Sequence, residues 1–130
     1  MDPPDALPAE LRAFLFSCIE SITQVELLLL LRGSDKFRGV RDLATDLRIP
    51  PAAVRRDLET LAARGLLEIK VSGETLYRYG PKTDELRQYG DQLAQHYITS
   101  RHLVLNFVST HARSSARRFA DAFKLRDKDQ

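Results

Sequence analysis

The sequence has a single cysteine and no long apolar segment. One cysteine excludes an intramolecular disulfide framework and fits a reducing cytoplasm. Cys18 lies on the apolar face of a predicted helix, where we expect a small buried side chain. The longest uninterrupted apolar run, residues 27–31, is far too short to span a bilayer. The start of the chain, MDPPDALPAE, is acidic and rich in proline, unlike a secretory signal. These features predict a soluble, cytoplasmic protein.

The motifs of common enzyme and metal sites are also missing. We find no glycine-rich phosphate loop, no Ser/His/Asp set and no carboxylate pair in a catalytic context. The three histidines, His96, His102 and His111, do not share one face of a helix, and none has an acidic or cysteine ligand three or four residues away. We therefore expect neither an enzyme nor a metal or cofactor site.

Charge is nearly balanced over the whole chain but not along it. The 20 basic and 18 acidic residues give a net charge of +2. Residues 1–22 carry one basic and four acidic residues, residues 23–82 carry eleven and eight, and residues 83–130 carry eight and six. The excess of positive charge after residue 22 is in the right direction for a phosphate-bearing partner.

Apolar periodicity predicts two helices at the start of the chain. Apolar residues recur at spacings of three and four between residues 7 and 22, which is typical of an amphipathic helix. Ser21 and Gln24 fit a capping box, so a second helix should begin near residue 22 and end at Arg32, with Gly33 in the left-handed conformation. Its five consecutive leucines favour a central, buried position.

A helix-turn-helix followed by a hairpin is predicted next. Phe37 fits a strand of one or two residues, Gly39 can cap a helix over 40–47, and Pro51 suits the first turn of a helix that runs to about Arg64. Gly65 should end that helix. Strands are predicted over 66–71 and 75–79, with a turn between them.

The C-terminal part is predicted to be helical. Thr83 caps a helix that we expect to continue to about residue 110, a length of roughly 40 Å. A second amphipathic segment, with Ala116, Phe119, Ala120 and Phe123, follows a break that we favour at 114–115. The long helix carries an apolar stripe that needs a covering surface, and we favour pairing with a second copy of the chain. The alternative is that it folds back on the helix of residues 7–21. The predicted dimer interface consists of Leu86, Tyr89, Leu93, Tyr97, Val104 and Phe107.

The helix that begins at Pro51 is the candidate DNA-reading element. Its apolar residues Val54, Leu58 and Leu61 share one face and should pack inward with Val40 and Leu43. Arginine side chains can contact guanine bidentately or clamp a phosphate, and backbone amides at a helix start can bind phosphate. Arg38 and Arg48 could add positioning contacts. The predicted DNA-binding residues are Arg41, Ala52, Ala53, Arg55, Arg56, Lys70 and Arg78.

Other features of this helix favour weaker DNA binding. Arg55 could pair with Glu59 one turn on, and Asp57 and Glu59 together cancel the charge of the two arginines. The helix start, Pro50-Pro51-Ala52-Ala53, offers no hydroxyl to a phosphate.

Residues 22–80 resemble winged helix-turn-helix transcriptional regulators, especially the DeoR-like and MarR-like groups. The resemblance rests on Val40-Arg41-Asp42-Leu43-Ala44, Val54-Arg55-Arg56-Asp57-Leu58, Leu61 and Arg64-Gly65-Leu66-Leu67-Glu68. It implies a mainly helical winged-helix fold with a small β-hairpin, and a bacterial regulator that binds duplex DNA as a homodimer. By that resemblance, Arg55 and Arg56 would take the recognition positions.

Three segments follow from this interpretation: an N-terminal tail and helix (1–21), the winged helix-turn-helix domain (22–82) and a dimerisation extension (83–130). The alternative function is a winged-helix module that binds protein instead of DNA. A small-molecule sensor built on the same dimer is a third hypothesis, with no effector identified.

Overall fold

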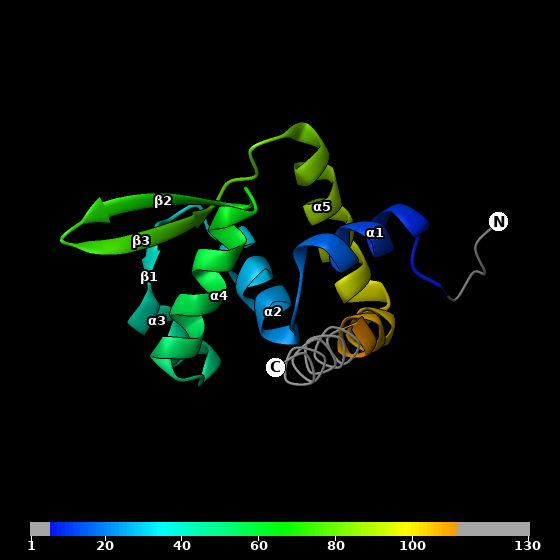
Figure 1. The fold of residues 1–130 in the computed structure, drawn as a ribbon, viewed down its shortest axis with the longest axis horizontal. Coiled ribbons are helices and arrows are strands. Elements are labelled where there is room, and N and C mark those ends of the chain that lie inside the picture. The colour runs from blue at the N-terminus through cyan, green and yellow to red at the C-terminus, as the bar shows by residue number, and fades with distance from the viewer. Residues whose placement is uncertain (1–5, 112–130) are drawn as a thin grey trace, which may run out of the picture.

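The structure is a computed structural model that describes residues 6–111. It is mainly helical with one small sheet, which confirms the predicted fold class (Figure 1). The predicted segment at 116–123 and the break at 114–115 lie outside the described residues.

The first two helices meet at a sharp corner, and the second of them is largely buried. α1 spans Ala9–Cys18 and α2 spans Ile22–Arg32. The Ser21 hydroxyl accepts the Gln24 backbone N–H at 3.2 Å, so the predicted cap is confirmed. Val25, Leu27, Leu28 and Leu31 of α2 are fully buried and its other apolar residues are half-buried, which gives the helix the central position that its leucines predict. The prediction for Gly33 is wrong: its φ of −74° is right-handed, and its N–H bonds the Leu29 carbonyl as in a continuing helix.

The helix-turn-helix forms largely as predicted, except that the short strand lies at Arg38–Gly39 instead of at Phe37. Strand β1 (Arg38–Gly39) leads into α3 (Val40–Leu47), and α4 spans Pro51–Ala63. Arg48 closes α3 in the left-handed conformation, with φ 57° and ψ 47°. Gly65, at φ 81°, lies just after α4 and turns the chain into the wing. The predicted core residues Leu43, Val54, Leu58 and Leu61 are fully buried, whereas Val40 is half-buried.

The wing is a hairpin that projects from the helices (Figure 1). β2 (Leu67–Ser72) and β3 (Glu74–Tyr79) pair antiparallel around Gly73, and β1 pairs with the other edge of β3. Leu67 and Tyr77 lie on the same face and are buried. Beyond Leu67 every residue of β2 is exposed, because the outer half of the hairpin extends past the helices.

The predicted continuous helix from residue 83 to about 110 is wrong. α5 spans Asp84–Thr99, capped by the Thr83 hydroxyl as predicted, and residues 101–111 form a separate helix. Ser100 (φ −144°, ψ 47°) ends the first helix and begins the second, since its carbonyl accepts the N–H groups of Leu103 and Val104. Serine favours helix starts because its side-chain hydroxyl can hydrogen-bond backbone N–H groups that the first turn leaves unpaired.

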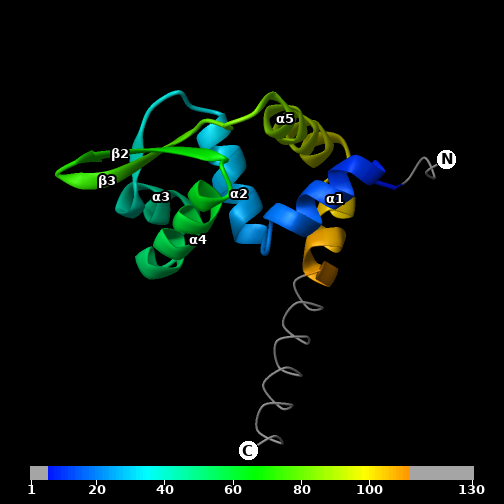
Figure 2. The ribbon, with the colours of Figure 1, turned by 45° about the horizontal axis from the view of Figure 1, so that its top comes forward.

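The helices after the wing fold back on α1, which is the alternative that the sequence left open. Phe14 of α1 stacks on Tyr89 of α5 with ring centroids 5.4 Å apart. Leu93 before the break and Val104 and Val108 after it are fully buried in the same core. Figure 2 shows α1 against these helices, with α2 between them and the helix-turn-helix.

Within residues 6–111, no single helix is long and apolar enough to cross a membrane. α1 and α2 reach the necessary length and composition only as a pair, and that pair is bent by 105°.

Candidate nucleic-acid interface

The outer face of α4 presents two arginines. Because Val54, Leu58 and Leu61 face the core, Arg55 and Arg56 are exposed in the helix's first half, as predicted. The ion pairs of the described residues include neither of them, and Arg55 therefore does not pair with Glu59. Both guanidinium groups are available to an external partner.

Asp57 does not share this face. Its side chain is 8% exposed, and its Oδ1 accepts a hydrogen bond from Nε2 of Gln24 at 3.2 Å. Asp57 therefore does not cancel an arginine on the outer face, contrary to the charge count made from the sequence. Near Arg55 and Arg56, that face carries Glu59 as its one acid, which leaves an excess of one positive charge.

The start of α4 offers less to a phosphate than predicted. Pro50 is the N-cap residue and makes no side-chain cap, and Pro51 has no N–H. Ala53 donates its N–H to the Pro50 carbonyl at 3.1 Å. Of the two predicted amide donors, this leaves the N–H of Ala52 to bind a phosphate, and Ala52 is exposed.

A groove separates α4 from the wing. It is lined by Arg41 of α3, Arg55 and Glu59 of α4, and Glu74 and Tyr77 of β3, among others. Burial raises the pKa of Tyr77, with a further increase from Glu59 and a decrease from Arg55. Two arginines face two carboxylates here, so the groove itself is electrically balanced.

The predicted wing contacts, Lys70 and Arg78, lie away from this groove. Side chains alternate across a strand, so both lie on the sheet face opposite Tyr77. There they flank Phe37, with the Arg78 guanidinium carbon 4.3 Å and the Lys70 ammonium 5.6 Å from its ring centroid. Arg78 is also paired with Glu68. The structure does not bring these two cations together with Arg55 and Arg56.

The other helix-turn-helix arginines divide into one that is engaged and two that are exposed. Arg38 bonds Asp42 and Asp46 of α3, and these contacts raise the pKa of Arg38 and lower that of Asp42. Arg41 and Arg48 are exposed and line a second groove beside the turn. They extend the positive surface from the start of α4 toward α3.

The predicted dimer residues differ in how exposed their side chains are in the single chain. Leu93 and Val104 have no exposed surface within the single chain, whereas Leu86, Tyr89, Tyr97 and Phe107 are half-buried. Phe107 lines an apolar groove with Leu7 and Leu103, between the start of α1 and the last described helix.

The histidines and the cysteine are dispersed. His96 is half-buried, His102 is exposed, and His111 is buried with its ring 4.5 Å from that of Phe16. Among the described residues no three His, Cys, Asp or Glu side chains gather as a metal site would need. Cys18 is half-buried, less than its sequence position predicts, and burial raises its pKa.

The fold resembles that of known transcriptional regulators. MarR from Escherichia coli, in its apo form, is 16% identical, with a TM-score of 0.52 over 88% of this chain and 84% of that one. The adhesin competence repressor AdcR from Streptococcus pyogenes is 17% identical, with a TM-score of 0.52 over 86% and 85%. BpsR from Bordetella bronchiseptica, whose DNA binding is regulated by 6-hydroxynicotinic acid, is 20% identical, with a TM-score of 0.50 over 94% and 84%.

At these identities the likeness establishes the fold. It confirms the predicted winged helix-turn-helix resemblance and extends it over most of the chain, in the MarR-like form. No family model matches the sequence, and no curated protein matches it either.

Proposed function

We propose that this protein is a cytoplasmic bacterial transcriptional regulator, not an enzyme, that binds duplex DNA as a homodimer. α4 would enter the major groove, with Arg55 and Arg56 reading bases or clamping phosphates. Residues 22–82 would form the DNA-binding domain, and residues 83–130 would contribute to dimerisation. The bacterial regulators with this fold support the proposal.

The observation that carries the proposal is the outer face of α4. A surface arginine without a carboxylate partner keeps its guanidinium free for phosphate or guanine. Arg55 and Arg56 are in this state. The neighbouring Asp57 is turned inward and accepts a hydrogen bond from Gln24. Exposed Arg41 and Arg48 could position the DNA backbone beside them.

Fluorescence anisotropy with random and genomic duplexes across a salt series tests this proposal. Wild-type affinity should fall steeply as salt rises, because phosphate contacts release counterions. The double variant Arg55→Ala/Arg56→Ala should bind more weakly. If both arginines contact phosphates, the slope of log affinity against log salt should become shallower by about 1.8.

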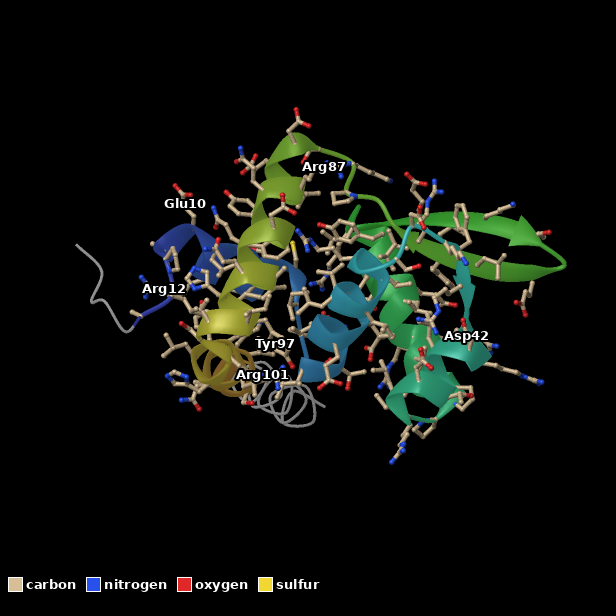
Figure 3. The ribbon with its side chains drawn as sticks, turned by 180° about the vertical axis from the view of Figure 1, so that it is seen from behind. Glu10, Arg12, Asp42, Arg87, Tyr97 and Arg101 are labelled. Carbon is tan, nitrogen blue, oxygen red and sulfur yellow. The ribbon has the colours of Figure 1, made fainter. Side chains whose placement is uncertain are left out.

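A matched control removes the same charge from another surface. Arg87 and Arg101 are exposed on α5 and on the following helix, far from Asp42 of α3 in Figure 3. Because Arg101 stacks on Tyr97 of the predicted dimer interface, light scattering must first show that Arg87→Ala/Arg101→Ala keeps the wild-type mass. That variant should then retain nearly wild-type affinity and salt slope. Equal losses in both double variants would indicate a general charge effect and refute the role of α4. Absence of wild-type binding at low salt would refute DNA binding altogether.

The second candidate function is a winged-helix module that binds protein. The wing favours it, because Ile69 and Val71 of β2 are 52% and 77% exposed and Glu74 at the tip would repel phosphate. The balanced charge of the groove between α4 and the wing is consistent with it as well. A wild-type protein that binds no duplex at low salt would make this the leading function.

A further inference from the structure

The corner between α1 and α2, residues 17–24, holds α4 at two points. The two helices that meet there are bent by 105° relative to each other. Gln24 contacts the middle of α4, and Ser17 and Glu20 contact its end. The corner is far from α4 in the sequence, so these are tertiary contacts that help to fix where the helix lies in the fold.

The first point is a buried bond between Gln24 and Asp57. Gln24 is 2% exposed, and both polar atoms of its side chain are engaged. Its Oε1 accepts the Glu20 backbone N–H at 2.8 Å, and its Nε2 donates to Asp57 Oδ1 at 3.2 Å. A buried polar group without a partner is costly, so this pair resists displacement of α4 from the corner.

The second point lies at the C-terminal end of the helix. Arg64 is the C-cap residue of α4, and its Nη1 donates to the Ser17 carbonyl at 2.9 Å while its Nη2 pairs with Glu20. Residues 57 and 64 are about 10 Å apart along a helix axis. Two attachments at that separation restrain both the direction of α4 and its rotation about its own axis.

We propose that Gln24 and Arg64 are positioning residues for DNA recognition, an inference that rests on the proposed DNA binding. Arg55 and Arg56 immediately precede the attachment at Asp57, so a rotation of α4 would move both guanidinium groups. The corner continues from α1, whose Phe14 stacks on Tyr89 of α5. It therefore connects the C-terminal helices to the recognition face.

Exchanging the donor and the acceptor of the Gln24–Asp57 hydrogen bond tests whether this bond positions α4 or only adds stability. Gln24→Glu keeps the acceptor for Glu20 but places a second carboxylate against Asp57, which should displace α4. Adding Asp57→Asn restores a donor facing an acceptor, now in the opposite direction. Asp57→Asn alone should have little effect, because the asparagine carbonyl can still accept from Gln24.

The measurements are hydrogen exchange of the α4 amides and duplex affinity, both at a temperature where every variant is folded. Gln24→Glu should lower α4 protection and DNA affinity by about tenfold each, and the double variant should recover both. Arg64→Lys keeps the charge but loses the two-pronged geometry, so it should weaken binding too. Arg32→Lys, which alters the Arg32–Asp91 pair elsewhere, should not.

These outcomes decide between the explanations. A folded Gln24→Glu protein with wild-type DNA affinity would overturn the inference, as would a loss that Asp57→Asn fails to recover. If the wild-type chain binds no DNA, the proposed function is refuted and this role in recognition with it. Hydrogen exchange would then still show whether the corner restrains α4.

Discussion

Gly90 of α5 provides a sharp test of how the C-terminal helices attach to the winged domain. It is buried, and the side chain of Tyr79 at the end of β3 lies directly over it. A Cβ on residue 90 would lie 3.2 Å from Tyr79 Cζ and closer still to the hydroxyl oxygen. Gly90→Ala should therefore push Tyr79 and α5 apart.

The magnitude follows from two opposing effects. Overpacking a well-packed site costs about 1–3 kcal/mol. Alanine gains about 1 kcal/mol over glycine inside a helix. The expected net change for Gly90→Ala is thus a loss of roughly 0–2 kcal/mol in the free energy of unfolding, although glycine-to-alanine changes in helices normally stabilise.

Removing the hydroxyl should relieve most of this cost. In a Tyr79→Phe background the closest contact is gone, so Gly90→Ala should be neutral or stabilise by up to about 1 kcal/mol. Urea unfolding of the four proteins, followed by circular dichroism, gives the coupling between the two sites, which should be about 1–3 kcal/mol, the overpacking cost relieved. Equal effects of Gly90→Ala in both backgrounds would show that Tyr79 does not lie against α5 as described.

Two further predictions concern the turn and the C-terminal groove. Arg48 adopts a left-handed conformation that is unfavourable for residues with a Cβ, so Arg48→Gly should be neutral or raise the free energy of unfolding by up to about 1 kcal/mol. If Arg48 contacts phosphate, the same change should weaken duplex binding, and a parallel fall in stability and affinity would contradict this account. Phe107→Glu places a charge in the apolar groove, so light scattering should give the 14.8 kDa of one chain if the wild-type protein is a dimer through this groove. A variant that keeps a dimeric mass would exclude the groove as the dimer contact.

Local signals predict where several helices begin and which face of α4 is buried. The hydroxyls of Ser21 and Thr83 cap the helices that they precede, and Pro51 opens α4, because capping depends on residues within one turn. Val54, Leu58 and Leu61 share a face at helical spacing, so their burial also follows from the sequence. Each of these features is determined by neighbours no more than four residues apart.

Two predictions are wrong because local sequence patterns did not determine the backbone conformation. The stripe from Leu86 to Phe107 has helical spacing on both sides of Ser100, so periodicity cannot show the break there. Gly33 follows a helix as a left-handed glycine would, yet its backbone is right-handed. At Ser100 the break accompanies the fold-back onto α1, whereas no packing contact explains the conformation of the exposed Gly33.

The charge of the recognition helix shows that a local sequence pattern can miss a long-range contact. Here the missed contact changes the functional argument. Counting Asp57 among the exposed acids makes α4 neutral and favours a protein partner. Its bond to Gln24, 33 residues earlier in the chain, removes Asp57 from the outer face and leaves Arg55 and Arg56 opposed by Glu59 alone. The same bond joins α4 to the corner of residues 17–24. A single long-range hydrogen bond therefore bears both on the sign of the charge offered to DNA and on the orientation in which it is offered.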